Sequence, residues 1–110
     1  MTRRMNQNEF QEIVVEQMNR CKNTLIKKGI EYDCETSDRF RSFKRGAVIL
    51  NMTPKQVLTG YLNKHIISIY DMCSSDKKYP VEQWNEKITD AINYLLLLRA
   101  LIEEESDEKN

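Results

Sequence analysis

The chain has 110 residues, enough for one domain with a modest core. Its 17 basic and 17 acidic residues cancel, so the composition favours neither duplex nucleic acid nor an anionic membrane as a partner. The longest apolar run, residues 91–98, is interrupted by Asn93 and is far shorter than the roughly 20 residues that span a bilayer. We therefore expect a single domain without a membrane segment.

The three cysteines, Cys21, Cys34 and Cys73, are an odd number without a Cys-x-x-Cys pair, and the N-terminus lacks a signal-peptide pattern. This usage is typical of a reducing cytoplasm. A zinc site built from Cys34, Cys73 and His65 is an alternative, but its spacing matches none of the usual zinc motifs. We therefore interpret the cysteines as small hydrophobic residues.

The sequence holds only three glycines and two prolines and no Asn-Gly or Asp-Gly hairpin signal, which indicates an all-α fold. We predict a compact bundle of four helices, ordered over about residues 8–105, with a frayed acidic C-terminal tail. The first helix is expected over residues 8–28, because Gly29 favours a helix end. Its apolar stripe comprises Phe10, Val14, Met18, Cys21 and Leu25.

Capping signals predict the second and third helices. The second is expected over residues 38–50, with Ser37 as the N-cap and Asp38 in the first turn, where the helix dipole favours an acid. The third begins at Pro54 behind the N-cap Thr53 and runs to about residue 73. Its expected core side comprises Leu58, Tyr61, Leu62, Ile66, Ile69 and Met72.

The fourth helix is expected from Pro80 to about residue 105. At 100° per residue, one stripe forms its predicted core face: Trp84, Ile88, Ala91, Leu95, Leu98 and Ile102. Glu86, Asp90 and Asn93 fall on the opposite side. Because Leu97 and Leu101 continue that side, the lower half is apolar nearly all round, which favours a central position or a homo-oligomer interface through this helix. Acids beside such a surface need a partner, such as a lysine, a metal ion or a helix terminus.

Polar residues on the third helix allow two interpretations. Lys64, His65, Ser68 and Asp71 lie within two turns, a set that can bind phosphate or help to hold magnesium. Alternatively, His65 is a half-buried histidine with one hydrogen bond and Lys64 is simply exposed to solvent. The sequence leaves both interpretations open.

Basic and aromatic residues alternate in the second helix. Its basic residues are Arg39, Arg41, Lys44 and Arg45, and they interleave with Phe40 and Phe43. Basic residues between aromatic rings can hold phosphate and stack on a base. The alternative is that the two phenylalanines belong to the core and the basic residues form a solvated face.

Two long segments resemble a family of small proteins encoded by phages and prophages of Gram-positive bacteria. They are KKGIEYDCETSDRFRSFKRGAVILNMTPKQVLTGYLNKHIISIYDM and WNEKITDAINYLLLLRALIEEE, about two thirds of the chain. The matching positions are Lys28, Tyr32, Asp38, Arg39, Phe43, Lys44, Lys64, His65, Ser68, Asp71, Trp84, Glu86, Lys87, Asp90, Asn93 and Tyr94. More distantly, the layout is similar to nucleotide modification associated domain 1 and to MazG-like all-α nucleotide pyrophosphohydrolases.

MazG-like enzymes hold magnesium against a nucleotide triphosphate with acids on two facing helices. This chain has fewer acids than their usual pattern, with Glu12 and Glu16 on the first helix and Glu86 and Asp90 on the fourth. The resemblance therefore implies a protein that binds a nucleotide or a nucleotide-derived phosphate ligand between its helices. Magnesium-dependent hydrolysis is one version of this function.

The resemblance also implies roles for particular residues. Glu86 and Asp90 are expected as magnesium ligands and catalytic acids if the protein is an enzyme, and otherwise as acceptors for a base edge. Phosphate contacts are expected from Arg39, Lys44, Lys64 and Lys87. His65 and Asn93 would orient the ligand, and Tyr32 or Phe43 would stack on it.

Two non-enzymatic alternatives follow. In the first, the protein sequesters a host signalling nucleotide, linear or cyclic, as an anti-defence factor in the cytoplasm of the infected bacterium. In the second, the apolar face of the fourth helix blocks a host protein and no nucleotide is bound. The sequence does not rank these alternatives.

Overall fold

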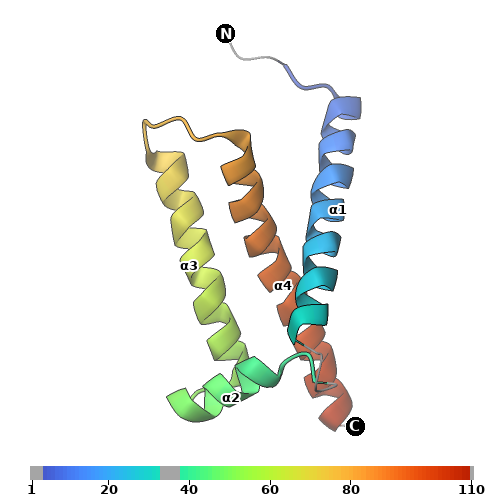
Figure 1. Ribbon diagram of the computed structural model, residues 1–110, viewed down its shortest axis with the longest axis vertical. Coiled ribbons are helices and arrows are strands. Elements are labelled where there is room, and N and C mark those ends of the chain that lie inside the picture. Colours follow the sequence, from blue (N-terminus) through green and yellow to red (C-terminus); the bar gives the residue numbers. More distant parts are fainter. Residues whose placement is uncertain (1–3, 33–37, 110) are drawn as a thin grey trace.

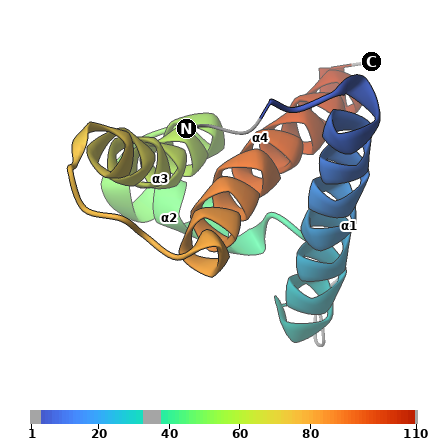
Figure 2. The same cartoon turned by 90° about the horizontal axis from the view of Figure 1, so that it is seen from above.

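The computed structural model describes residues 4–32 and 38–109, with side-chain surroundings for residues 4–27 and 38–107. Within these residues the chain forms helices and no strand, so the predicted all-α fold is confirmed. The helices are α1 (Gln7–Tyr32), α2 (Arg41–Leu50), α3 (Pro54–Ser74) and α4 (Val81–Lys109). Figures 1 and 2 show α4 between α3 and α1, antiparallel to α3, while the short α2 lies across the lower end. No helix in the described part is both long and apolar enough to cross a membrane.

A capping box fixes the start of α3. The Thr53 hydroxyl accepts a hydrogen bond from the Gln56 backbone N–H at 3.2 Å, and the Gln56 side chain accepts one from the Thr53 N–H at 2.8 Å. Pro54 occupies the first turn, where its missing N–H leaves no hydrogen bond unmade. The predicted N-cap is therefore confirmed.

The other helix boundaries differ from the predicted ones. α2 begins at Arg41 instead of residue 38, because the Asp38 side chain accepts a hydrogen bond from the Phe40 N–H at 2.9 Å and forms a local turn. The predicted cap Ser37 lies outside the described residues. α1 continues past Gly29, since one glycine costs a long helix only about 1 kcal/mol. α4 extends to Lys109, through the segment that was expected to fray.

The hydrophobic core lies where α3 and α4 meet α2. Its fully or nearly fully buried members are Phe40, Leu58 and Leu101, and Phe43, Tyr94, Leu97 and Leu98 pack against them. This core also anchors the residue that precedes α2, so it positions the basic start of α2 against α4.

The predicted core stripe of α4 is only partly confirmed, because Ala91 is buried and Leu98 packs against the core, but three other members are not buried. Ile88, Leu95 and Ile102 are exposed, whereas Leu101 is 1% exposed and Asn93 is 6% exposed. Because the lower half of α4 is apolar nearly all round, its periodicity could not indicate which side faces α3. Thr89 and Asn93 thus lie in the interior together with Ala91 and Leu101, while Ile88, Leu95 and Ile102 remain outside.

The predicted stripe of α1 is buried only in its second half. Cys21 is fully buried and Leu25 half-buried, but Phe10, Val14 and Met18 are exposed. The side-chain contact between α1 and α4 includes the middle of α1, where Gln17 donates a hydrogen bond to Thr89. On α3, Leu58 and Met72 are buried as expected. Tyr61 and Ile66 are nearly half exposed, so that stripe too is only partly a core face.

Candidate functional site

A pocket of about 290 Å³, here called the α2–α4 pocket, opens where all the helices approach the start of α2. Two arginines, two carboxylates, one amide and three aromatic rings are among the residues that line it. The full lining is Leu25, Asp38, Arg39, Arg41, Ser42, Phe43, Tyr61, Asp90, Asn93, Tyr94 and Leu97. Of the residues predicted to form a site, the structure thus brings together Arg39, Phe43, Asp90 and Asn93.

Aromatic rings form a continuous row beside this pocket. Tyr61 and Tyr94 stack with centroids 6.2 Å apart and planes 13° apart, and Phe43 meets Tyr61 edge-on at 6.1 Å. His65 stacks on Tyr94, and the two ring centroids lie 5.1 Å apart. Such a row offers a planar ligand both stacking and edge contacts.

Asn93 is the most unusual residue of the pocket. Its side-chain oxygen is buried and has no hydrogen-bond partner among the described residues, although the residue lines the pocket. Leaving a buried acceptor unpaired costs about 1–3 kcal/mol, and native proteins rarely retain such a group without a reason. Because this oxygen has almost no accessible surface, the carboxamide would have to rotate before the oxygen could accept a hydrogen bond from a ligand in the pocket.

Asp90 stands one helical turn before Asn93 on α4. Its carboxylate lies 3.9 Å from the Nδ1 atom of His65, too far for a hydrogen bond, and the two groups form an ion pair only when His65 is protonated. The Asp90 oxygens are therefore available as acceptors on the same wall as the Asn93 carboxamide. His65 is half-buried, as the simpler of its two interpretations expected.

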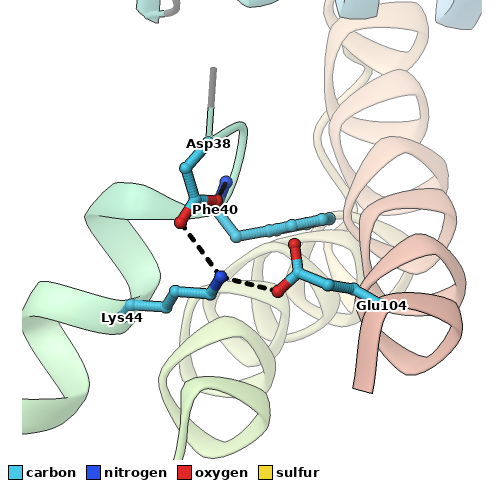
Figure 3. A network of polar contacts seen from close by, with 4 residues as sticks. All are labelled: Asp38, Phe40, Lys44 and Glu104. Atoms are coloured by element: carbon cyan, nitrogen blue, oxygen red, sulfur yellow. Dashed lines mark hydrogen bonds and ion pairs between the residues drawn. The ribbon is translucent and has the colours of Figure 1, made fainter. Parts of the chain in front are cut away.

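Lys44, an expected phosphate contact, does not line the α2–α4 pocket and forms two ion pairs. Its ammonium group lies 2.9 Å from Asp38 and 2.6 Å from Glu104, so it ties the entry to α2 to the last turns of α4 (Figure 3). Hydrogen bonds to Glu104 and then to Asp38 raise the pKa of Lys44. The bond from Lys44, followed by that from the Phe40 N–H, lowers the pKa of Asp38. With two carboxylates beside it, Lys44 has little charge left for a ligand.

A second, polar groove of about 480 Å³ runs between α1 and α4. It is lined by Arg20, Asn23, Thr24, Asn85, Glu86, Thr89 and Asp90, and beside it Gln17 donates a 2.7 Å hydrogen bond to Thr89. The predicted acid pair is therefore divided, because Asp90 lines both hollows while Glu86 lines only the groove.

Few side chains near these acids could coordinate magnesium. In the described part of the chain, no three His, Cys, Asp or Glu side chains gather closely enough to hold a metal ion. Glu86 and Asp90 supply two carboxylates, and Mg²⁺ bound by so few protein ligands depends on substrate phosphates for the rest of its shell. The structure thus gives no support to a dedicated metal centre at these acids.

The remaining predicted contacts lie outside the α2–α4 pocket. Lys64 is exposed, with its ammonium 5.6 Å from the centroid of the Tyr61 ring, and Lys87 is half-buried elsewhere on α4. The side chain of Tyr32 lies outside the described residues. Among the cysteines, Cys21 is a buried free thiol and Cys73 an exposed one, and Cys34 also lies outside the described residues.

Sequence reasoning assigned no ligand role to seven of the eleven lining residues, among them Arg41, Tyr61 and Tyr94. Arg41 was visible only as one member of a basic cluster, and Tyr61 was assigned to the core. The signal that could have found the tyrosines is their position, since Tyr61 lies one turn before His65 and Tyr94 directly follows Asn93.

Similarity to other proteins gives no further guide to this site. Comparison with protein-family models, with curated proteins and with solved structures found no match to this chain.

Proposed function

We propose that the α2–α4 pocket binds a single nucleotide and that the protein acts by holding this ligand. The observation that carries the proposal is the buried Asn93 oxygen, which lacks a partner in the wall of a pocket that also holds arginines and stacked rings. A ligand that donates a hydrogen bond there would relieve the cost of the unpaired acceptor.

The chemistry of the walls suggests how the nucleotide lies. The phosphate would meet Arg39 and Arg41, whose guanidinium groups suit bidentate contacts to phosphate oxygens. The base would lie against the aromatic row, with its edge toward α4. Since Asp90 and Asn93 offer acceptors, a base with adjacent N–H donors fits this edge, and we expect guanine to bind more tightly than adenine.

The size of the pocket favours one nucleotide over a cyclic dinucleotide. Its volume of about 290 Å³ lies at the lower end of small-molecule sites, which span roughly 300–1,000 Å³. Together with the thin donor set for magnesium, this favours sequestration of a signalling mononucleotide over metal-dependent hydrolysis. For a phage protein, removal of such a ligand would serve as a defence against the host response.

Calorimetry of the purified protein tests the proposal. We expect GMP or cyclic GMP to bind, AMP to bind more weakly, a cyclic dinucleotide not to bind, and added magnesium to change little. Arg41→Gln should lower the affinity by about 1.5–3 kcal/mol, the value of a hydrogen bond to a charged group. Arg45→Gln is the matched control, because Arg45 lies on the same helix but does not line the pocket.

Two results would overturn the proposal. If none of these nucleotides bound, the apolar surfaces would become the better guide and a host protein would be the expected target. If phosphate were released in a magnesium-dependent reaction that Asp90→Asn abolished, the protein would be a hydrolase.

A further inference from the structure

The start of α2 forms one wall of the α2–α4 pocket. Arg39, Arg41, Ser42 and Phe43 all line that pocket, and they lie at or directly before the first turn of the helix. The N-cap position is occupied by Phe40, whose ring belongs to the core and cannot accept a hydrogen bond from the helix. α2 therefore begins without the side-chain cap that Ser, Thr, Asp or Asn would supply.

Two backbone N–H groups at this start remain open. The first N–H groups of any helix have no acceptor within the helix. Those of Phe40 and Arg41 already donate to Asp38, at 2.9 and 3.3 Å. Among the described residues, no atom accepts a hydrogen bond from the N–H groups of Ser42 and Phe43. Together with the helix dipole, these two groups favour a negatively charged ligand group at this point of the pocket.

The start of α3 is closed by comparison. There the Thr53 hydroxyl accepts a hydrogen bond from the Gln56 N–H at 3.2 Å, and Pro54 has no N–H to satisfy. Neither residue of that capping box lines the α2–α4 pocket. The same chain thus offers a capped helix start outside the pocket as an internal control for the uncapped start inside it.

A separate observation on α4 also indicates a ligand in this pocket. Asn93 is 6% exposed, lines the pocket, and has a side-chain oxygen without a hydrogen-bond partner among the described residues. Buried acceptors of this kind are rare because leaving them unpaired costs free energy. A ligand with an anionic group at the start of α2 and an N–H donor near Asn93 would serve both walls.

The acids near the start of α2 are already engaged. Asp38 lies 2.9 Å from the Lys44 ammonium group, which also pairs with Glu104 (Figure 3). The other lining acid, Asp90, belongs to α4 and lies 3.9 Å from His65. The groups left to meet an anion at the first turn are donors, namely the arginines, the Ser42 hydroxyl and the two N–H groups.

On the basis of the nucleotide function proposed above, we propose that the open start of α2 selects a terminal phosphomonoester over a cyclic phosphodiester. A terminal phosphate presents three outer oxygens and nearly two negative charges at pH 7.5. A cyclic diester presents two outer oxygens and one charge. The larger number of acceptors matches the several donors gathered at the first turn, so the ligand is a nucleoside monophosphate with a free phosphate end.

Calorimetry with GMP and cyclic GMP tests this selectivity. We expect GMP to bind about tenfold more tightly at pH 7.5. At pH 5 the advantage should shrink to about twofold, because a phosphomonoester with a second pKa of about 6 then carries mainly one charge. His65, Asp38 and Asp90 face both ligands alike, so cyclic GMP corrects for their titration. Equal affinities at pH 7.5 would overturn this inference alone, whereas no binding of either would overturn the proposed function as well.

Two matched variants test the position of the phosphate. Ser42→Glu places a carboxylate in the first turn of α2, where the helix dipole stabilises it, so the unfolding midpoint should not fall. GMP affinity should nevertheless drop about tenfold, because the carboxylate repels the phosphate. Gln56→Glu places the same charge in the first turn of α3 and should leave GMP affinity unchanged. Unchanged affinity in Ser42→Glu, or an equal loss in both variants, would overturn the assignment.

Amide resonances report the contact directly. On addition of GMP, the amide protons of Ser42 and Phe43 should move downfield, because a phosphate oxygen would accept hydrogen bonds from them. The Gln56 amide proton, which already donates to Thr53, should not move. Binding of GMP without a shift at Ser42 and Phe43 would show that the phosphate lies elsewhere in the pocket and would overturn the inference.

Discussion

The two sides of α4 differ in how completely the rest of the protein covers them. The side toward α1 and α2 carries Asp90 and the buried Asn93, while the outer side carries exposed Leu95 and Ile102. A helix of a small domain usually buries its apolar stripe and leaves its polar residues in water. The inner side of α4 thus buries a polar amide among apolar residues, and the outer side leaves part of its apolar stripe exposed.

The largest expected difference between these sides is in stability. Leu101→Ala removes a fully buried side chain next to Phe40 and Leu58, and we expect the free energy of unfolding to fall by about 2–5 kcal/mol. Leu95→Ala changes a half-exposed side chain and should cost less than half as much. Urea unfolding at one protein concentration measures both, and equal losses would contradict the orientation of α4.

Asn93→Leu separates ligand binding from stability. Because the change replaces an unpaired buried acceptor by an apolar side chain of similar size, we expect the protein to become more stable by about 1 kcal/mol. Nucleotide binding should be lost in the same variant. Thermal unfolding with calorimetry checks both, and Asn85→Leu, in the polar groove, should leave binding unchanged. Loss of stability in Asn93→Leu would show that the amide has a structural partner.

Lys44→Met tests whether the network of Lys44 with Asp38 and Glu104 holds the inner side of α4 in place. The lysine and both carboxylates are about one third exposed, so solvent screening limits the expected loss to about 1 kcal/mol. Arg45→Met on the same helix should have no effect. A lower urea midpoint for Lys44→Met than for Arg45→Met would show that the Lys44 ion pairs stabilise the fold. Equal midpoints would show that they do not.

Acid should remove the Asp38 part of this network. Because the pKa of Asp38 is lowered in the folded protein, its contribution is full above the unfolded value of 3.8 and is lost as the pH falls through the folded value. Lys44 stays charged there, since its pKa is raised above 10.5. Asp38→Asn should therefore be less stable than the native chain at pH 6, and the difference should shrink as the pH falls below 3.8 and vanish below the folded pKa of Asp38.

Local signals in the sequence predicted the all-α class, the start of α3 and several pocket residues. The Thr53–Gln56 capping box depends only on neighbouring residues, so sequence alone suffices to place it. The alternation of basic and aromatic residues over 39–45 likewise predicted a possible ligand surface, of which Arg39, Arg41 and Phe43 line the pocket. These features have in common that their physical cause lies within a few residues.

Features that depend on distant residues escaped prediction. The orientation of α4 depends on which side packs on α3, and four successive leucines offer the packing no preferred side. The engagement of Lys44 depends on Glu104, which lies sixty positions later in the chain. The sequence alone predicted that Lys44 was available to a ligand, because one of its two partners, Glu104, belongs to another helix.

The shortness of α2 has a consequence for motion. A helix of 10 residues is marginal by itself in water, so α2 depends on Phe40, Phe43 and Lys44 for its attachment to the rest of the protein. Because α2 and the residues just before it supply one wall of the α2–α4 pocket, local opening of α2 would open the way to Asn93. Amide protons of α2 should then exchange with solvent faster than those of α3, and a bound ligand should slow them.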